Sequence, residues 1–150
     1  VLEEPELVEP VALVHRAVEN AVRSGQAVAL GSVAAPAEVR LRPQAVMRAL
    51  DNLISNAVRY GKHATVSLQA TATTLSFIVE DDGPGIPEAR RDEAMEPFKR
   101  LDAARNPNKG GGVGLGLSIA ADIARSHGGA LRLGESATLG GLRAELQLAL

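Results

Sequence analysis

The sequence lacks cysteine and tryptophan, and it contains only one tyrosine and two phenylalanines among its 150 residues. Without cysteine the chain forms no disulfide, thiolate metal site or cysteine nucleophile, which fits a reducing compartment. With 2% aromatic residues it offers no surface on which the bases of a single strand could stack. A formal net charge of -2 adds no general attraction for a polyanion, so we expect no nucleic-acid partner.

Long hydrophobic runs are also missing. No stretch approaches the roughly 20 apolar residues that a helix needs to cross a bilayer, and the first residues lack the basic and apolar regions of a signal peptide. We therefore expect a cytoplasmic domain that makes no membrane contact itself. Hydrophobic residues make up 45% of the chain, which is enough for one substantial core, so residues 1–150 are expected to form a single domain.

The periodicity of the apolar residues predicts three helices and several short strands. The helices are expected from Pro10 to Ser24, from Pro43 to about Tyr60, and over residues 117–127. Strands are expected at residues 27–30, 38–41, 65–70, 75–80, 130–133 and 142–148, with an antiparallel hairpin over 65–80. The expected fold class is an α+β two-layer sandwich, in which three helices pack on a mixed sheet of about five strands.

Between Asp81 and Gly116 this pattern is replaced by glycine, proline and charged residues, and we expect only one short helix there, after Pro87. An irregular segment of this length inside a compact domain is typical of a functional lid or a disordered loop. The segment begins and ends in glycine-rich motifs, so those motifs are the first place to look for a site.

The helix predicted over residues 43–60 carries its polar residues on one face. Asn52 and Asn56 lie one turn apart, in line with Arg48, Ser55 and Arg59. An amide oxygen is a suitable ligand for Mg²⁺, which keeps most of its waters and shares phosphate oxygens. Taken alone, the same residues are more often an ordinary solvated helix face.

Two further motifs flank the irregular segment. Residues 80–87 (Glu-Asp-Asp-Gly-Pro-Gly-Ile-Pro) follow a predicted strand, where a fixed carboxylate can accept a hydrogen bond from the amine of a base, although a tight turn explains them equally well. Residues 110–118 (Gly-Gly-Gly-Val-Gly-Leu-Gly-Leu-Ser) open a predicted helix, where glycine amides and the helix dipole favour phosphate. Neither segment has the G-x-G-x-x-G spacing of a dinucleotide-binding fingerprint. Gly61-Lys62 is not the end of a P-loop, because His63 follows it and Asn56 stands five positions before Gly61.

The order of these motifs resembles the histidine-kinase catalytic domain. Residues 52–61, 81–85, 96–100 and 112–117 are similar to its N, G1, F and G2 boxes, and the similarity runs from about Leu41 to the C-terminus. This is the Bergerat-type ATP fold, shared with DNA gyrase B, the ninety-kilodalton heat-shock chaperone and MutL proteins. The motif sequences look closest to those of osmosensor-type kinases.

The resemblance implies ATP and Mg²⁺ as cofactors and assigns roles to individual residues. Asn56 would ligate Mg²⁺, Asn52 would support the same site, and Arg59 would contact phosphate with Tyr60 beside the base. Asp81 would accept from the adenine amine. The ring would be accommodated by Gly83, Gly85 and Ile86.

A long ATP lid is also implied. Lys99 or Arg100 would meet the triphosphate, with Arg105 and Lys109 as weaker candidates. The phosphates would be wrapped by Gly112, Val113, Gly114, Leu115, Gly116 and Leu117. A threonine frequent in this box is Val113 here, and a hydroxyl often found near the adenine is replaced around Gly141 and Leu142.

The resemblance further implies a kinase and not a hydrolase. ATP-hydrolysing relatives place a glutamate where this chain has Asn52, and an amide cannot accept a proton from water. We expect Asn52, Asn56, Lys99 and Arg100 to take part in transfer of the γ-phosphate to a histidine on a separate helical dimerisation domain of the same kinase. A response regulator would be an indirect partner. The full-length kinase would be anchored in the membrane. None of the chain's own histidines is followed by an acidic residue as the family's acceptor is. A non-catalytic nucleotide-binding module and an anti-sigma-type serine kinase remain the alternatives.

Overall fold

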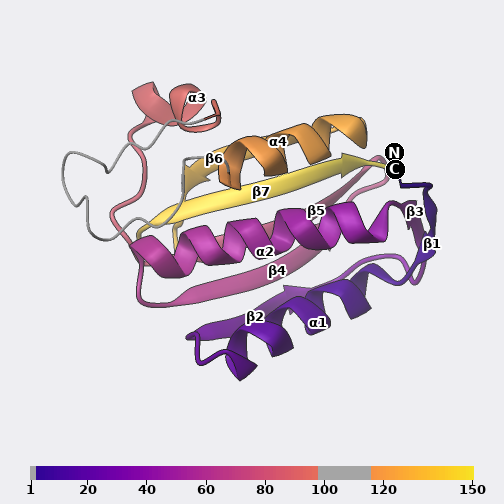
Figure 1. Cartoon of the computed structure of the whole chain (residues 1–150), viewed down its shortest axis with the longest axis horizontal. Coiled ribbons are helices and arrows are strands. Elements are labelled where there is room, and N and C mark those ends of the chain that lie inside the picture. Colours follow the sequence, from indigo (N-terminus) through magenta and orange to yellow (C-terminus); the bar gives the residue numbers. More distant parts are fainter. Residues whose placement is uncertain (1–2, 98–115) are drawn as a thin grey trace.

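The computed structural model describes residues 3–97 and 116–150, and it has two layers (Figure 1). Three helices, α1 (Pro10–Arg23), α2 (Pro43–Tyr60) and α4 (Gly116–Ser126), cover one face of a five-stranded sheet. The strands are β2 (Val28–Val33), β4 (Ala64–Ala70), β5 (Thr74–Asp81), β6 (Ala130–Glu135) and β7 (Leu142–Ala149). Their order is β2-β4-β5-β7-β6, in which only β2 and β4 run parallel, so the predicted mixed α+β sandwich is confirmed.

The local predictions are largely confirmed. The three long helices lie where the apolar periodicity placed them, and β4 and β5 form the expected antiparallel hairpin. The short helix expected after Pro87 is present as a 3₁₀ turn, η1 (Glu88–Arg90), followed by α3 (Arg91–Ala94).

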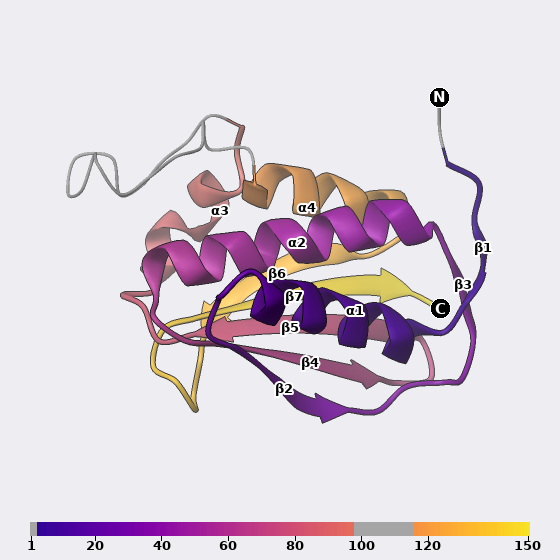
Figure 2. The ribbon, with the colours of Figure 1, turned by 60° about the horizontal axis from the view of Figure 1, so that its bottom comes forward.

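One of the predicted strands lies outside the main sheet. Residues 38–41 do form a strand, β3 (Val39–Leu41), but it does not join the main sheet. It pairs instead with β1 (Glu6–Val8), which the sequence analysis missed, and the two make a separate antiparallel ribbon beside the N-terminus of α2 (Figure 2). Three residues are too few for alternation to distinguish a strand from a connection.

Helix α2 lies at the centre of the helical layer, against β5 and α4 (Figure 2). It starts at Pro43, whose missing N–H costs nothing in the first turn. Its apolar stripe is buried against the sheet and consists of Val46, Met47, Ala49, Leu50, Leu53, Ile54 and Ala57. The opposing strand residues Phe77, Leu146 and Leu148 are also buried, so the packing holds α2 firmly along its length.

The N-terminus of α2 is anchored by two side chains from distant parts of the chain. The carboxylate of Glu3 accepts the backbone N–H groups of Gln44 and Ala45 at 2.9 and 3.0 Å, which satisfies two of the free donors of the first turn. The ring Nε2 of His127 accepts the N–H of Arg42 at 3.1 Å. Both contacts lie at the end of α2 away from its asparagines.

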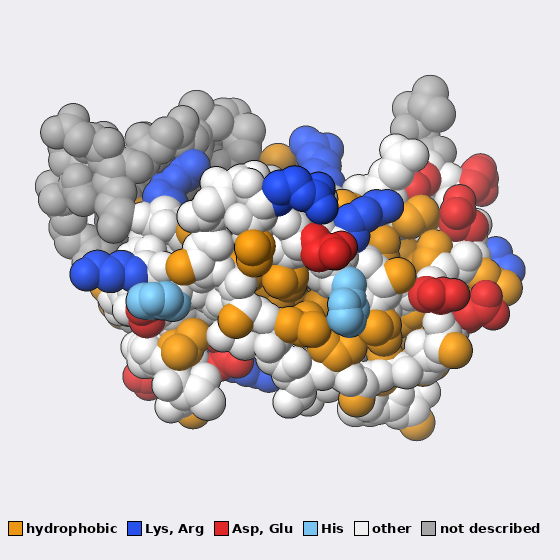
Figure 3. Space-filling view, turned by 90° about the horizontal axis from the view of Figure 1, so that it is seen from below, with side chains coloured by type: hydrophobic (Ala, Val, Ile, Leu, Met, Phe, Trp, Pro, Cys, Tyr) orange, Lys and Arg blue, Asp and Glu red, His pale blue; other side chains and the backbone are white. Residues whose placement is uncertain are grey.

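Hydrophobic side chains gather at the centre of the face seen in Figure 3, with charged side chains around them. Among the described residues, the exposed large apolar side chains include Val22 of α1 and Leu30 of the edge strand β2. The pairing of β2 with β4 shifts register between Leu30 and Val33, and such an irregularity disfavours edge-to-edge association. Within the described ranges, no helix has the length and apolar character needed to span a bilayer.

Candidate functional site

The C-terminal end of α2 meets the end of β5 through two tightly packed turns. A Cβ at Gly61 would lie 2.7 Å from Oδ1 of Asp82 and 3.0 Å from the backbone nitrogen of Gly83. A Cβ at Gly83 would lie 2.7 Å from the carbonyl oxygen of Tyr60. Neither position has room for a side chain, so glycine at both allows the two backbones to touch. The predicted asparagine helix and the predicted strand-end motif therefore meet at one place.

Asp81 is the last residue of β5, and only 3% of its surface is exposed. Its Oδ1 accepts the backbone N–H groups of Gly83 at 2.9 Å and Leu142 at 3.1 Å. Burial raises the pKa of this carboxyl above its ordinary value, and the two backbone hydrogen bonds oppose that rise. Within the described residues Oδ2 accepts no hydrogen bond, so one oxygen is fixed and the other remains for a ligand.

Gly141 also contacts this site, although the sequence marks it only as a place where a hydroxyl is replaced. In the structure its N–H donates to the carbonyl oxygen of Asp81 at 3.0 Å, and a Cβ here would meet Oδ1 of Asp81 and lie 2.6 Å from the nitrogen of Gly83. The pair Gly140-Gly141 before a strand was the available indication of a close backbone approach.

The structure gives the predicted ring-accommodating residues more specific roles. Position 83 requires glycine because a side chain there would clash with the backbone of Tyr60. Position 85 requires glycine because its φ is +72°, which a residue with a side chain rarely adopts. Ile86 packs partly buried against the core, and its carbonyl accepts the Nε–H of Arg91 at 3.0 Å. These residues shape the turn after Asp81.

The two predicted asparagines lie in the second half of α2. Asn56 is half-buried, and Asn52, one turn earlier, has a buried Nδ2 with no hydrogen-bond partner among the residues the structure describes. An unpaired buried amide is costly, so a polar group is expected to meet it. The start of α4 is close by, since a Cβ at Gly116 would lie 4.0 Å from the carbonyl oxygen of Asn52. Arg59 and Tyr60 follow at the end of the helix, both half-buried.

The remaining predicted residues divide into two groups. The side chain of Leu117 is buried in the core, so only its backbone is suited to face a ligand. The lid cations and most of the glycine strap lie outside the described residues: Lys99, Arg100, Arg105, Lys109, Gly112, Val113, Gly114 and Leu115.

The donor set fits an adenine nucleotide better than a metal held by the protein alone. The described residues contain no group of three histidine, cysteine or acidic side chains able to bind a metal ion. Among the described residues, Asp81 is a buried carboxylate with one oxygen that accepts no hydrogen bond, which matches a base amine. Asn52 has an amide nitrogen with no partner among the same residues, beside a helix start, which matches phosphate and hydrated Mg²⁺. If Mg²⁺ is present, Asn56 and Asn52 are the residues that would hold it together with the phosphates.

Comparison with known proteins identifies the family. The model of the histidine kinase-, DNA gyrase B- and HSP90-like ATPases matches residues 41–150, which is where the expected similarity begins. The sensor histidine kinase GtrS of Pseudomonas aeruginosa is 38% identical over 136 residues, which are 91% of this chain and 27% of that protein.

Solved structures agree with this. The histidine kinase domain of the Escherichia coli osmosensor EnvZ is 33% identical with a TM-score of 0.72, and the match covers 99% of this chain and 91% of that one. The ATP-binding domain of PrrB from Mycobacterium tuberculosis is 27% identical with a TM-score of 0.76, over 98% of both chains. The chain spans between 22% and 30% of the length of the curated relatives reported in these comparisons. It belongs to the histidine kinase-, DNA gyrase B- and HSP90-like ATPase family, as the catalytic ATP-binding domain of a histidine kinase.

Proposed function

We propose that this domain binds Mg·ATP in the site between α2, the end of β5 and the start of α4, and transfers the γ-phosphate to a histidine on a separate helical dimerisation domain of the same kinase. The observation that carries the proposal is Asp81, a buried carboxylate with one oxygen held by two backbone N–H groups and the other without a donor among the described residues. In this proposal the domain lies in the cytoplasm, where ATP is available.

Adenine is recognised in this proposal through Oδ2 of Asp81, which accepts no hydrogen bond from the part of the chain that the structure describes. An ionised carboxylate only accepts hydrogen bonds, so it pairs with the exocyclic amine of adenine and not with the carbonyl that guanine carries at the same position. The hydrogen bonds from Gly83 and Leu142 prevent the carboxylate from turning away. The result is selectivity for adenine without an aromatic stacking surface.

The triphosphate lies, in this proposal, along the second half of α2. Asn52 donates from its unpaired Nδ2, Asn56 supplies an oxygen for Mg²⁺, and Arg59 adds a positive charge at the helix end. Lys99, Arg100 and the strap residues 112–117 complete the enclosure as proposed ligands of the phosphates. Mg²⁺, when bound, neutralises phosphate charge and assists alignment.

The acceptor in this proposal is external. During transfer the bond between the γ-phosphorus and the β–γ bridging oxygen breaks, a bond to a histidine ring nitrogen forms, and ADP leaves. Asn52 cannot accept a proton from water, which disfavours hydrolysis as a competing reaction. A response regulator then receives the phosphoryl group from the histidine.

The test combines this domain with the histidine-bearing helical domain of its own kinase and ATP labelled in the γ-phosphate. We expect label on the helical domain in an acid-labile, alkali-stable form, as phosphohistidine requires. Acid-stable label would instead indicate a serine kinase. Nucleotide binding without transfer to any histidine domain would indicate a regulatory module and contradict the proposed kinase activity.

A further inference from the structure

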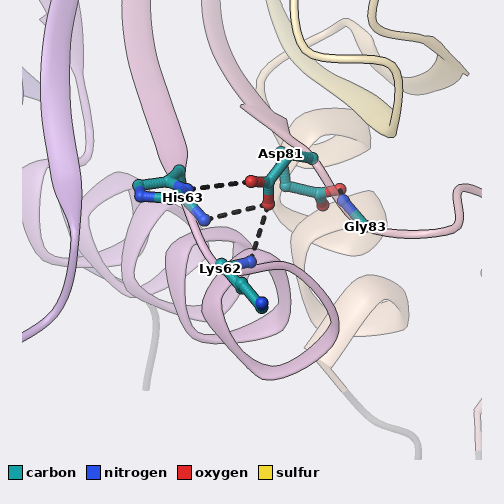
Figure 4. Close-up of polar contacts among 5 residues, drawn as sticks. Lys62, His63, Asp81 and Gly83 are labelled. Atoms are coloured by element: carbon teal, nitrogen blue, oxygen red, sulfur yellow. Dashed lines mark hydrogen bonds and ion pairs between the residues drawn. The ribbon is translucent and has the colours of Figure 1, made fainter.

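Asp82, next to the proposed adenine ligand, is engaged on both of its carboxylate oxygens. Oδ1 accepts the backbone N–H groups of Lys62 at 2.6 Å and His63 at 2.9 Å, and Oδ2 lies 2.9 Å from Nδ1 of His63. Figure 4 shows Lys62 and His63 on one turn facing the segment that contains Asp81 and Gly83. The backbone N–H of Asp82 donates to the carbonyl oxygen of His63 at 3.3 Å. Both carboxylate oxygens and the backbone N–H of Asp82 therefore bind the turn formed by Lys62 and His63.

These bonds join the two halves of the proposed site. Lys62 and His63 follow directly after the end of α2, the helix that carries the proposed phosphate contacts. Asp82 follows directly after Asp81, the proposed adenine contact. The pKa of Asp82 is held well below its ordinary value by the backbone N–H of His63, the ring of His63 and the backbone N–H of Lys62, so the carboxylate is ionised at neutral pH.

We propose that Asp82 is a positioning residue, which sets the spacing between the adenine-binding end of β5 and the phosphate-binding end of α2. This inference rests on the proposed function and assigns one more residue to the same site. ATP is a bivalent ligand in this view, because its base and its triphosphate each occupy one half. Binding of one half raises the effective concentration of the other only if the two halves are held at the matching distance.

The consequence is a specific pattern of affinities. Without the contact of Asp82 with Lys62 and His63, one half of the site could still bind adenosine and the other half could still bind triphosphate. The two halves would no longer lie at the spacing that ATP requires to occupy both. A displacement of about 1 Å is enough to cost a large factor in a site that requires alignment. Asp82→Ala should therefore weaken binding of the whole nucleotide more than binding of its parts.

The experiment measures the dissociation constants of Mg·ATP, adenosine and tripolyphosphate with Mg²⁺ by chemical-shift titration. For Asp82→Ala we expect an increase of about tenfold or more for Mg·ATP and less than about twofold for the two fragments. Asp82→Asn keeps an oxygen for the two backbone N–H groups and should give a smaller increase. Lys62→Ala is the matched control, because Lys62 contributes only its backbone N–H to this contact.

Each outcome has a distinct meaning. If the wild-type domain does not bind Mg·ATP, the proposed function fails. If the wild type binds and Asp82→Ala binds all three ligands equally well, the inference fails and the proposed function stands. Equal losses for adenosine, tripolyphosphate and Mg·ATP would mean that Asp82 only supports the fold, which also overturns the inference. Should Asp82→Ala not fold, the same three titrations on Asp82→Asn and His63→Ala decide between these outcomes.

Discussion

The backbone N–H of Leu142 lies 3.1 Å from Oδ1 of Asp81, although the two residues are 61 positions apart in the sequence. Asp81 ends β5 and Leu142 begins β7, and these strands are neighbours in the sheet. The orientation of the buried carboxylate is thus determined in part by a second strand, and with it the direction of Oδ2, which accepts no hydrogen bond from the described residues. Changes on either strand should affect nucleotide binding.

Replacing Asp81 by asparagine should separate binding from folding. The amide oxygen can still accept the N–H groups of Gly83 and Leu142, but an NH₂ group then faces the amine of adenine, donor against donor. We expect the ATP dissociation constant to rise at least about tenfold, from the loss of a charge-assisted hydrogen bond of about 1.5–3 kcal/mol, with the fold intact. Calorimetric titration checks the affinity and the melting temperature checks the fold. Unchanged affinity would exclude Asp81 as the adenine ligand.

Gly141→Ala should damage both the site and the stability of the domain. The added Cβ would meet the Asp81 carboxylate and the backbone of Gly83, and neither can move without breaking hydrogen bonds. Overpacking of this kind costs about 1–3 kcal/mol in unfolding free energy. Gly134→Ala is the matched control, since nothing lies within 4 Å of the Cβ position there. Urea denaturation of both variants tests the difference, and equal effects would contradict it.

Asn52→Leu should have opposite effects on stability and on binding. The substitution removes a buried amide nitrogen that has no partner within the described residues, and it keeps a similar volume. We expect the unfolding free energy of the nucleotide-free domain to stay constant or to rise by about 1 kcal/mol. The affinity for Mg·ATP should fall. A variant that loses stability but binds Mg·ATP normally would show that Asn52 serves the fold and not the ligand.

Asp82 should make the stability of the domain depend on pH in the acid range. Its folded pKa is below the ordinary 3.8, so its stabilising contribution is complete above that value and is lost as the pH falls through the folded pKa. The contribution of Asp81 to the pH dependence of stability has the opposite sign. Its pKa is raised, so its ionisation lowers the stability of the domain as the pH rises through the raised pKa. Denaturation measured from about pH 5 down to about pH 2 should show a shallower acid loss for Asp82→Ala than for the wild type. A steeper loss would contradict the assignment.

His127→Ala should weaken the anchor at the other end of α2. The His127 ring accepts the N–H of Arg42 through Nε2 and donates to the carbonyl of Ile123 at 2.8 Å through Nδ1. Leaving these groups unpaired should lower the unfolding free energy by about 1–3 kcal/mol. His15→Ala, at an exposed position on α1, is the control and should stay within about 0.5 kcal/mol of the wild type. Similar losses in the two variants would refute the anchoring role.

Helix α2 and the strand end at Asp81 were predictable because their information is local. An apolar stripe of Val46, Leu50, Leu53, Ile54 and Ala57 after a proline predicts the helix, and a carboxylate before glycines predicts a turn after a strand. Contacts between distant segments were not predictable. The hydrogen bond from Leu142 to Asp81 leaves no mark in the local pattern. The pair Gly140-Gly141 indicates a close backbone approach but not the segment that approaches, because that depends on which strands become neighbours.

The contact of Asp82 with Lys62 and His63 has the same explanation. In the sequence, two adjacent aspartates before a glycine are typical of any turn. Only the packing of Gly61 on Gly83 brings the end of α2 within reach of that carboxylate. Strand β1 and its pairing with β3 were missed for a different reason, because a strand of three residues is too short to show alternation.

The most direct measurement of the central claim is an amide chemical-shift titration of the domain with Mg·ATP, in the wild type and in Asp81→Asn. One binding site formed by α2, the end of β5, the start of β7 and the start of α4 predicts saturable shifts with a single dissociation constant at Asn52, Asn56, Gly83 and Gly141, and the loss of these shifts in the variant. Absence of saturable shifts at these residues, or binding that the variant leaves unchanged, would contradict the claim.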